Sequence, residues 1–215
     1  MSYAVKEIFL TLQGEGRQAG RRAVFLRFSG CNLWSGREQD RASADCQFCD
    51  TDFVGMDGDH GGRYRTAAAL ADKVQELWAA EPLDSAGAIP FVVMTGGEPL
   101  LQVDEALIAA LHERGFEIAV ETNGTIAAPA GIDWICVSPK AGTEIVQRSG
   151  NELKLVWPQP GNDHKAMAEW AFDHFLVSPM DGLDIAETTA ATIAFVLAHP
   201  RWRLSVQAHK LIGVR

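Results

Sequence analysis

Three of the four cysteines lie in one stretch, from Cys31 to Cys49, with the spacing C-x14-C-x2-C. Three thiolates without a fourth leave one coordination position open, which catalytic metal centres require and structural ones do not. Cys46 and Cys49 form a tight chelating turn, and Phe48 between them can shield a bound group. A loop as long as the polar insert from Ser35 to Asp45 adds only roughly 1 kcal/mol of closure entropy. The long first spacing is therefore compatible with a metal site.

Simpler explanations of these cysteines remain open at this point. The three thiols could form a structural zinc site with His60 as the fourth ligand. Disulfides are disfavoured, because a chain with four cysteines and no signal peptide is typical of a reducing compartment. Cys136 lies in the apolar run from Trp134 to Val137, where a cysteine usually acts as a small buried hydrophobic residue.

Composition limits the classes of protein to consider. A chain of 215 residues, 47% hydrophobic, can bury one sizeable core, so we expect a single domain over residues 1–215. The net charge of -9 and the scattered basic residues argue against a nucleic-acid partner. No apolar run is long enough for a membrane span and no targeting pattern begins the chain. We therefore expect a cytoplasmic protein without a membrane partner.

Short β-rich runs alternate with helical patterns along the chain, which predicts an α/β fold with right-handed crossovers and a parallel sheet. We expect this sheet to curl into a partial (βα)6-type TIM barrel, with its ligand site at the carboxyl ends of the strands. The predicted strands are 24–28, 91–94, 116–120, 134–137, 153–157, 174–177 and 203–206, and the predicted helices are 66–81, 103–114, 164–172 and 186–198.

The loops after the first four predicted strands contain polar or glycine-rich residues, so they should face one cavity together with the cysteines. Gly96 and Gly97 follow the second strand and would let the backbone approach a ligand, although paired glycines are often only a tight turn. The carboxylate of Glu98 could then accept hydrogen bonds from an ammonium group. With an open metal site nearby, this turn indicates a ligand that carries an amino-acid group.

These residues together resemble a known family. The segment from Leu12 to Gly16 and the segment from Phe25 to Trp34 are similar to those of radical S-adenosylmethionine (SAM) enzymes, specifically the 7-carboxy-7-deazaguanine synthases of the queuosine pathway. The resemblance covers nearly the whole chain. The commonest pattern of the superfamily, C-x3-C-x2-C, would put its second cysteine at Ser35, so the stretch from Ser35 to Asp45 is interpreted as an insertion in the cluster loop.

The resemblance implies the cofactors. Cys31, Cys46 and Cys49 would hold a [4Fe-4S] cluster whose remaining iron binds the amino and carboxylate groups of SAM. Reductive cleavage of SAM would give a radical that abstracts hydrogen from the substrate, so the protein mainly positions and shields. The SAM-binding residues that the resemblance implies are Phe48, Asp50, Gly96, Gly97, Glu98, Ser138, Pro139 and Lys140.

The implied substrate is 6-carboxy-5,6,7,8-tetrahydropterin. Its hydrogen-bonding edge and its carboxylate suit an amide, an acid and a guanidinium, which Gln13, Glu15 and Arg27 supply. Charge pattern alone would favour an ordinary surface pair between Glu15 and Arg27, and the resemblance reverses that preference. The implied substrate-binding residues are Leu12, Gln13, Gly14, Glu15, Arg27, Thr95, His209 and Arg215.

Thr51 is a candidate ligand for Mg²⁺, which the resembled family uses beside its substrate. Magnesium prefers oxygen ligands and is commonly held by few protein groups plus substrate oxygens; the alternative is a threonine that caps a turn. The resemblance further implies an external electron donor of flavodoxin or ferredoxin type and allows a homodimer. A different radical SAM enzyme, such as an activase, or a zinc-binding module remain as alternative functions.

Overall fold

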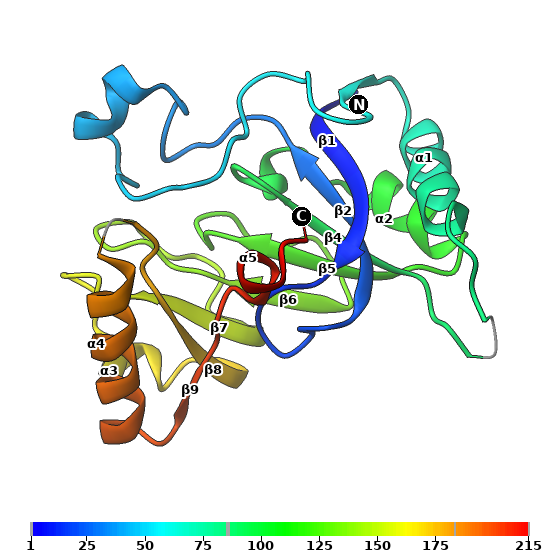
Figure 1. Cartoon of the computed structure of the whole chain (residues 1–215). Helices are drawn as coiled ribbons and strands as arrows, with labels where there is room; N and C mark the ends of the chain where they lie inside the picture. The colour runs from blue at the N-terminus through cyan, green and yellow to red at the C-terminus, as the bar shows by residue number, and fades with distance from the viewer. Residues whose placement is uncertain (1, 85–86, 183, 215) are drawn as a thin grey trace.

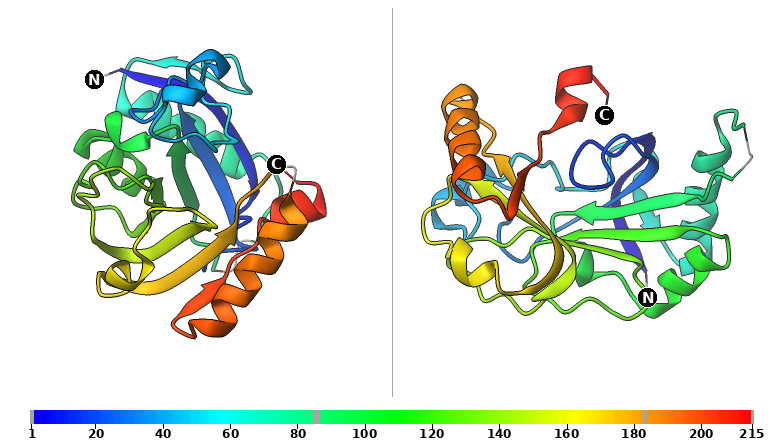
Figure 2. Two further views of the ribbon diagram at one scale, coloured as in Figure 1. Left: turned by 90° about the vertical axis from the view of Figure 1, so that its left-hand side faces the viewer. Right: turned by 90° about the horizontal axis from the view of Figure 1, so that it is seen from below.

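One curved sheet dominates the structure, a computed structural model that describes residues 2–84, 87–182 and 184–214. Within these residues the sheet has nine strands in the order β3-β1-β2-β4-β5-β6-β7-β8-β9. The expected α/β partial barrel is confirmed, and its curvature is visible in Figure 2. The strands are β1 (Tyr3–Leu12), β2 (Arg22–Phe28), β3 (Gly62–Tyr64), β4 (Phe91–Gly96), β5 (Glu117–Thr122), β6 (Trp134–Val137), β7 (Ser149–Trp157), β8 (Ala171–Pro179) and β9 (Trp202–Leu204). The helices are η1 (Glu38–Ser43), α1 (Ala67–Ala79), η2 (Pro99–Leu101), α2 (Glu105–His112), α3 (His164–Met167), α4 (Ile185–Ala198) and α5 (Ala208–Ile212).

The sheet is parallel from β2 to β9, as the alternation of strands and helices predicted. Strand β4 has the burial that is typical of a parallel strand. Its residues from Phe91 to Met94 are all buried, as expected for a strand covered on both faces. Val92 pairs in register with Val24 of β2 and with Ile118 of β5. The seven predicted strands are thus present, and their carboxyl ends meet at one edge.

Two strands were not predicted. β1 pairs antiparallel with β2, and β3 pairs antiparallel with β1, so the parallel sheet carries an antiparallel edge. The buried side chains of Tyr3, Val5 and Ile8 fix β1 to the core. The prediction of a wholly parallel sheet is therefore wrong at this edge.

Helices α1 and α2 cover the outer face of the sheet (Figure 1). Helix α1 begins after Thr66, whose hydroxyl accepts a hydrogen bond from the backbone N–H of Ala69. Its buried residues include Leu70 and Val74, which lie four residues apart and therefore on one helical face. Gly115 follows α2 with a φ of 76°, the left-handed conformation that glycine adopts at helix ends.

The other end of the sheet is covered by α4, which packs on β8 and β9. Here Phe195 and Trp202 are buried, with their ring centroids 6.0 Å apart. Among the helices of the described residues, none combines the length and the apolar character needed to cross a membrane.

The predicted helix 164–172 needs correction, and a helix that was not predicted follows Gln207. The predicted helix 164–172 is only α3, because the following residues join β8 and pair with β7. Phe172 and Phe175 are buried in the sheet, so the strand places both rings in the apolar core. The tail after Gln207 forms α5, which crosses the open side of the barrel (Figure 2).

Candidate active site

Two adjoining cavities open at the carboxyl ends of the strands, where the ligand site was expected. The cysteine cavity, about 200 Å³, includes these predicted residues in its lining: Cys31, Cys46, Phe48, Cys49, Asp50, Gly96, Gly97, Ser138 and Lys140. The outer cavity, about 420 Å³, includes Leu12, Gln13, Gly14, Glu15, Arg27, Thr51, Thr95 and His209. The residues that line both are Glu15, Asp50, Thr51, Thr95, Glu121, Asp181 and Gln207. Most of the predicted SAM residues thus line the cysteine cavity and most of the predicted substrate residues line the outer cavity, while Glu15, Asp50 and Thr95 line both.

The three clustered thiols lie on the wall of the cysteine cavity as free thiols. A hydrogen bond between the sulfurs of Cys46 and Cys49 lowers the pKa of Cys49 to about 6 and raises that of Cys46. Burial raises the pKa of Cys31, although backbone N–H groups oppose this, and the amide nitrogen of Leu33 lies 3.4 Å from its sulfur. Of the three thiols, that of Cys49 therefore ionises most readily near neutral pH.

This donor set fits a cluster with several irons. Among the described residues, no three His, Cys, Asp or Glu side chains are arranged as ligands of a single metal ion. In a [4Fe-4S] cluster each thiolate binds a different iron, so its ligands surround a volume and do not converge on one point. Cys136 on β6 also reaches this cavity, but burial raises the pKa of its thiol well above the ordinary value.

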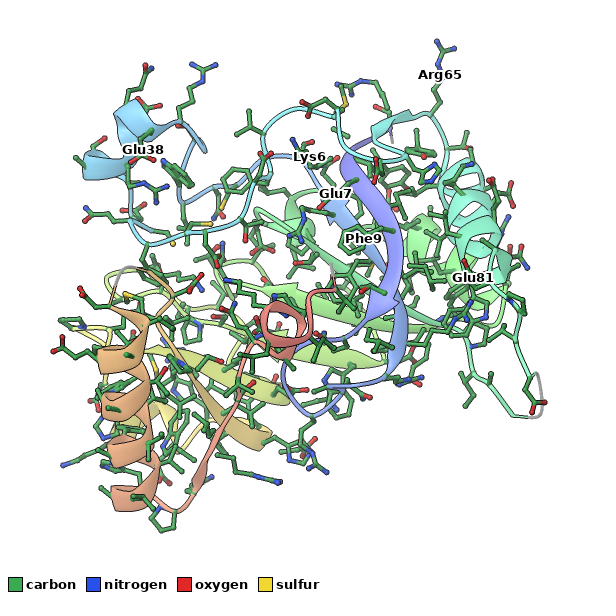
Figure 3. All side chains as sticks on the ribbon, viewed as in Figure 1. Lys6, Glu7, Phe9, Glu38, Arg65 and Glu81 are labelled. Atoms are coloured by element: carbon green, nitrogen blue, oxygen red, sulfur yellow. The ribbon has the colours of Figure 1, made fainter. Side chains whose placement is uncertain are left out.

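The inserted loop is tied to the cysteine turn by Arg41. Its guanidinium lies over the ring of Trp34, 4.1 Å from the centroid, and donates hydrogen bonds to the carbonyl oxygens of Gln47 (2.9 Å) and Cys49 (3.1 Å). Arg41 also pairs with Glu38 of η1, which stands apart from the side chains of β1 in Figure 3. The insert therefore braces the loop that carries two of the three thiols.

The glycine turn after β4 lies against the loop that carries Cys31. A Cβ added at Gly97 would lie 2.7 Å from the Cβ of Cys31, so only glycine permits this approach. Glu98 follows, and its carboxylate is fully buried, accepting hydrogen bonds from Leu100 N–H (2.9 Å), Thr122 hydroxyl (2.8 Å) and Asn123 N–H (2.8 Å). In this structure the carboxylate joins the ends of β4 and β5, and its expected contact with a ligand's ammonium group stays a prediction.

The Ser138–Lys140 segment after β6 places one cation at the cysteine cavity. The Lys140 ammonium donates to the carbonyl (2.7 Å) and hydroxyl (2.8 Å) oxygens of Ser138 and lies 5.8 Å from the Phe48 ring centroid. Burial lowers the pKa of Lys140, and the nearby thiols oppose that shift. Pro139 is buried and does not line the cavity, which differs from its predicted contact with SAM.

The outer cavity brings together the predicted substrate residues. Arg27 pairs through its Nε with Glu7 at 2.9 Å, whereas Glu15 pairs with Lys154 at 2.5 Å. The alternative of a surface pair between Glu15 and Arg27 is thus not found. Arg215 lies outside the described residues, and His209 lies against Gly14.

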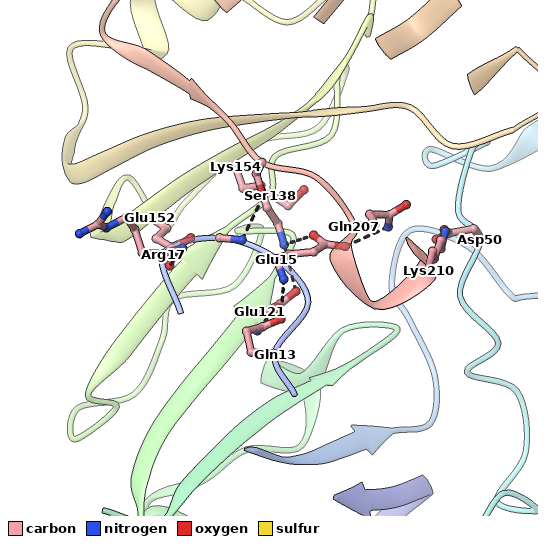
Figure 4. Close-up of polar contacts among 12 residues, drawn as sticks. Gln13, Glu15, Arg17, Asp50, Glu121, Ser138, Glu152, Lys154, Gln207 and Lys210 are labelled. Carbon is pink, nitrogen blue, oxygen red and sulfur yellow. Dashed lines mark hydrogen bonds and ion pairs between the residues drawn. The ribbon is translucent and has the colours of Figure 1, made fainter. Parts of the chain in front are cut away.

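A buried network that the sequence analysis missed lies between the two cavities (Figure 4). Lys154 of β7 contacts Glu15 and, at 3.3 Å, Glu121 of β5; Gln207 donates to Glu15 at 2.9 Å. Burial alone would raise the pKa of Glu15, but the charge and hydrogen bond of Lys154 lower it to about 2. The available sequence signal was a lysine between the apolar residues Leu153 and Leu155 and a glutamate directly after the apolar run from Ile118 to Val120, because buried charges need partners.

The carboxyl-terminal helix is attached to the site by Lys210. Its ammonium lies 2.8 Å from a carboxylate oxygen of Asp50 and 2.5 Å from one of Asp181. The backbone N–H of Ala208 also donates to the carbonyl of Gly14 at 2.9 Å. Segments that are distant in the sequence therefore meet over the outer cavity.

Comparison with known proteins agrees with this geometry. Residues 39–156 match the Radical SAM superfamily, more than half of the chain, so the protein belongs to that superfamily. The chain is 63% identical over 215 residues to the 7-carboxy-7-deazaguanine synthase of Bradyrhizobium diazoefficiens, and 62% identical to that of Caulobacter vibrioides, with full coverage of each chain. The crystal structure of QueE from Escherichia coli has the same fold, with a TM-score of 0.72 at 24% identity over 97% of this chain and 95% of that one. The chain is a member of the 7-carboxy-7-deazaguanine synthase family.

Proposed function

We propose that this chain converts 6-carboxy-5,6,7,8-tetrahydropterin to 7-carboxy-7-deazaguanine with loss of ammonia, in queuosine biosynthesis. The full-length relatives support this activity over an activase or a zinc-binding module. The observation that carries the proposal is the adjacency of the two cavities, one with the thiols of Cys31, Cys46 and Cys49 and one with an amide, carboxylates and a guanidinium.

In this proposal Cys31, Cys46 and Cys49 hold the [4Fe-4S] cluster, and the cysteine cavity holds SAM. When bound, the cluster and SAM supply a radical that abstracts hydrogen from the substrate. The residues proposed to line SAM are Phe48, Asp50, Gly96, Gly97, Ser138 and Lys140. The Lys140 ammonium adds a positive charge beside the thiols of Cys46 and Cys49.

The outer cavity is proposed to hold the pterin. Arg27 uses its Nε for Glu7, which leaves both terminal nitrogens to bind a carboxylate in two hydrogen bonds. Glu15 supplies carboxylate oxygens as acceptors, and Gln13 supplies a carboxamide, for the hydrogen-bonding edge of the pterin ring. Thr51 lines both cavities between Asp50 and Asp52, and we propose its hydroxyl as a ligand of Mg²⁺ that also binds substrate oxygens.

The proposal is tested by turnover of anaerobically reconstituted enzyme with SAM, a reductant and 6-carboxy-5,6,7,8-tetrahydropterin. The expected result is a brown, iron-containing protein that forms 7-carboxy-7-deazaguanine, detected by mass spectrometry. A protein that cleaves SAM but releases no 7-carboxy-7-deazaguanine would refute the proposed reaction. A colourless protein that contains zinc would refute the cluster as well.

We propose a flavodoxin or ferredoxin as the source of the electron, tested by comparing SAM cleavage with each reduced protein. We also propose a homodimer through apolar side chains of the carboxyl-terminal helix, of which Leu211 is 78% exposed and Ile212 61% exposed. They lie near a shallow groove lined by Leu12 and Val214. Sedimentation as a monomer at micromolar concentration would refute the dimer.

A further inference from the structure

Lys154 is a buried cation that the proposed reaction does not use directly. It lies on β7, is 6% exposed, and lines the cysteine cavity. Its ammonium lies 2.5 Å from a carboxylate oxygen of Glu15 and 3.3 Å from one of Glu121. Both of these carboxylates line both cavities, so Lys154 holds together two acids at the boundary between them.

The contacts of Lys154 belong to a closed ring of polar groups (Figure 4). Glu121 accepts a hydrogen bond from the Gln13 carboxamide at 2.8 Å, and the oxygen of that carboxamide accepts from the Glu15 N–H at 3.0 Å. Glu15 then returns to Lys154. Each group in the ring forms a hydrogen bond or an ion pair with the groups on either side of it. These contacts fix the orientation of the Gln13 carboxamide and of both carboxylates.

Without a cation, the ring would place two carboxylates close together in a partly dehydrated site. Like charges in such a site cannot both stay ionised, so the pair would share a proton. A shared proton would turn one carboxylate acceptor into a donor. The Gln13 carboxamide would then no longer be held in one orientation. The amino and ring N–H groups of a pterin need acceptors, so a protonated acid would bind this edge more weakly.

We propose that Lys154 is a positioning residue for the pterin: it keeps Glu15 and Glu121 as aligned carboxylates, so that the cavity presents acceptors to the donor edge of the ring. This inference rests on the proposed function. It adds a requirement for a cation that does not itself need to contact the substrate.

Other charged groups face the same ring. Glu152 precedes Lys154 on the same face of β7 and accepts from the Trp134 indole N–H at 2.7 Å. His209 faces Glu15 from the carboxyl-terminal helix, and Cys136 of β6 and Lys140 interact electrostatically with Lys154. The charge of Lys154 acts to lower the pKa of Glu152, Cys136 and Lys140, so an uncharged variant shifts their titration as well, whereas Lys154→Arg keeps this contribution in place.

The test compares Lys154→Met, Lys154→Gln and Lys154→Arg in the reconstituted holoenzyme with SAM and without reductant, so that no turnover occurs. Calorimetric titration with 6-carboxy-5,6,7,8-tetrahydropterin is run from mildly acidic to neutral pH. We expect Lys154→Met and Lys154→Gln to lose affinity relative to the parent by about tenfold for each pH unit below the apparent pKa of the carboxylate pair. Lys154→Arg should keep the parent's pH profile, because it keeps the charge.

A matched control is Arg114→Met, which removes a partly buried cation from an ion pair with Asp72, at 2.6 Å, on the outer helices. It should leave the pH profile of binding unchanged, and iron content should match the parent in every variant. If Lys154→Met does not fold, Lys154→Gln provides the uncharged comparison. A parent-like pH profile in the uncharged variant would overturn the inference, as would an equal, pH-independent loss in that variant and in Lys154→Arg. A parent enzyme that binds no pterin would instead refute the proposed function, and the inference with it.

Discussion

The contact between the glycine turn and the cluster loop predicts a specific effect of Gly97→Ala. The new Cβ would lie 2.7 Å from the Cβ of Cys31, whereas two carbon atoms need about 3.5 Å. It would lie closer still to the carbonyl oxygen of Gly30, which also accepts a hydrogen bond from Glu98 N–H at 3.0 Å. The Gly30 oxygen is a backbone atom and the Cys31 Cβ is bonded directly to the backbone, so neither can rotate away. The turn at Gly97 and the loop that carries Cys31 must therefore separate by roughly 1 Å.

Overpacking of this kind typically costs about 1–3 kcal/mol. If the strain is relieved by moving the cluster loop, SAM affinity should fall by about 5- to 150-fold. The assay is equilibrium binding of SAM to the reconstituted protein, with iron content measured on the same sample. We expect weaker SAM binding in Gly97→Ala, accompanied by some loss of iron.

The control is Gly115→Ala at the end of α2, whose Cβ would meet no atom within 4 Å, although its φ of 76° makes the substitution strained. This variant also loses stability, but its strain lies away from the cluster loop, so SAM affinity and iron content should stay close to those of the parent. Gly97→Ala with the parent's SAM affinity and iron content would show that the close approach is not required, and would refute this reasoning.

Three further predictions concern the proposed ligands. Cys31→Ala should lose the cluster while Cys136→Ala keeps it; an equal loss of iron in both would overturn the ligand assignment. Arg27→Lys should weaken pterin binding more than SAM binding, because lysine lacks the bidentate fork; equal losses in titrations of the two ligands would make Arg27 a structural residue. Turnover should rise with added Mg²⁺, and Thr51→Val should reduce this response at fixed subsaturating substrate without changing iron content. An unchanged Mg²⁺ response would exclude Thr51 as a ligand.

Much of the framework was predictable from the sequence because it depends on local patterns. The C-x14-C-x2-C spacing identified the three thiols of one cavity, and continuous apolar runs such as Phe91 to Met94 identified buried parallel strands. Strand β1 was missed, and α3 was predicted too long, because the pairing partners of a strand are distant in the sequence. The helical pattern in the sequence extends to Phe172, but the residues from Ala171 onward form strand β8 and pair with β7.

The roles of the charged residues were decided only by the tertiary structure. The sequence suggested Glu98 as a ligand for an ammonium group, yet strand order places it where Thr122 and Asn123 occupy its carboxylate. Likewise Glu15 is separated from Lys154 by most of the chain, and only the closure of the sheet brings them within 2.5 Å. A residue type determines which partners are chemically possible, but burial makes one partner necessary, and strand order determines which partner is within reach.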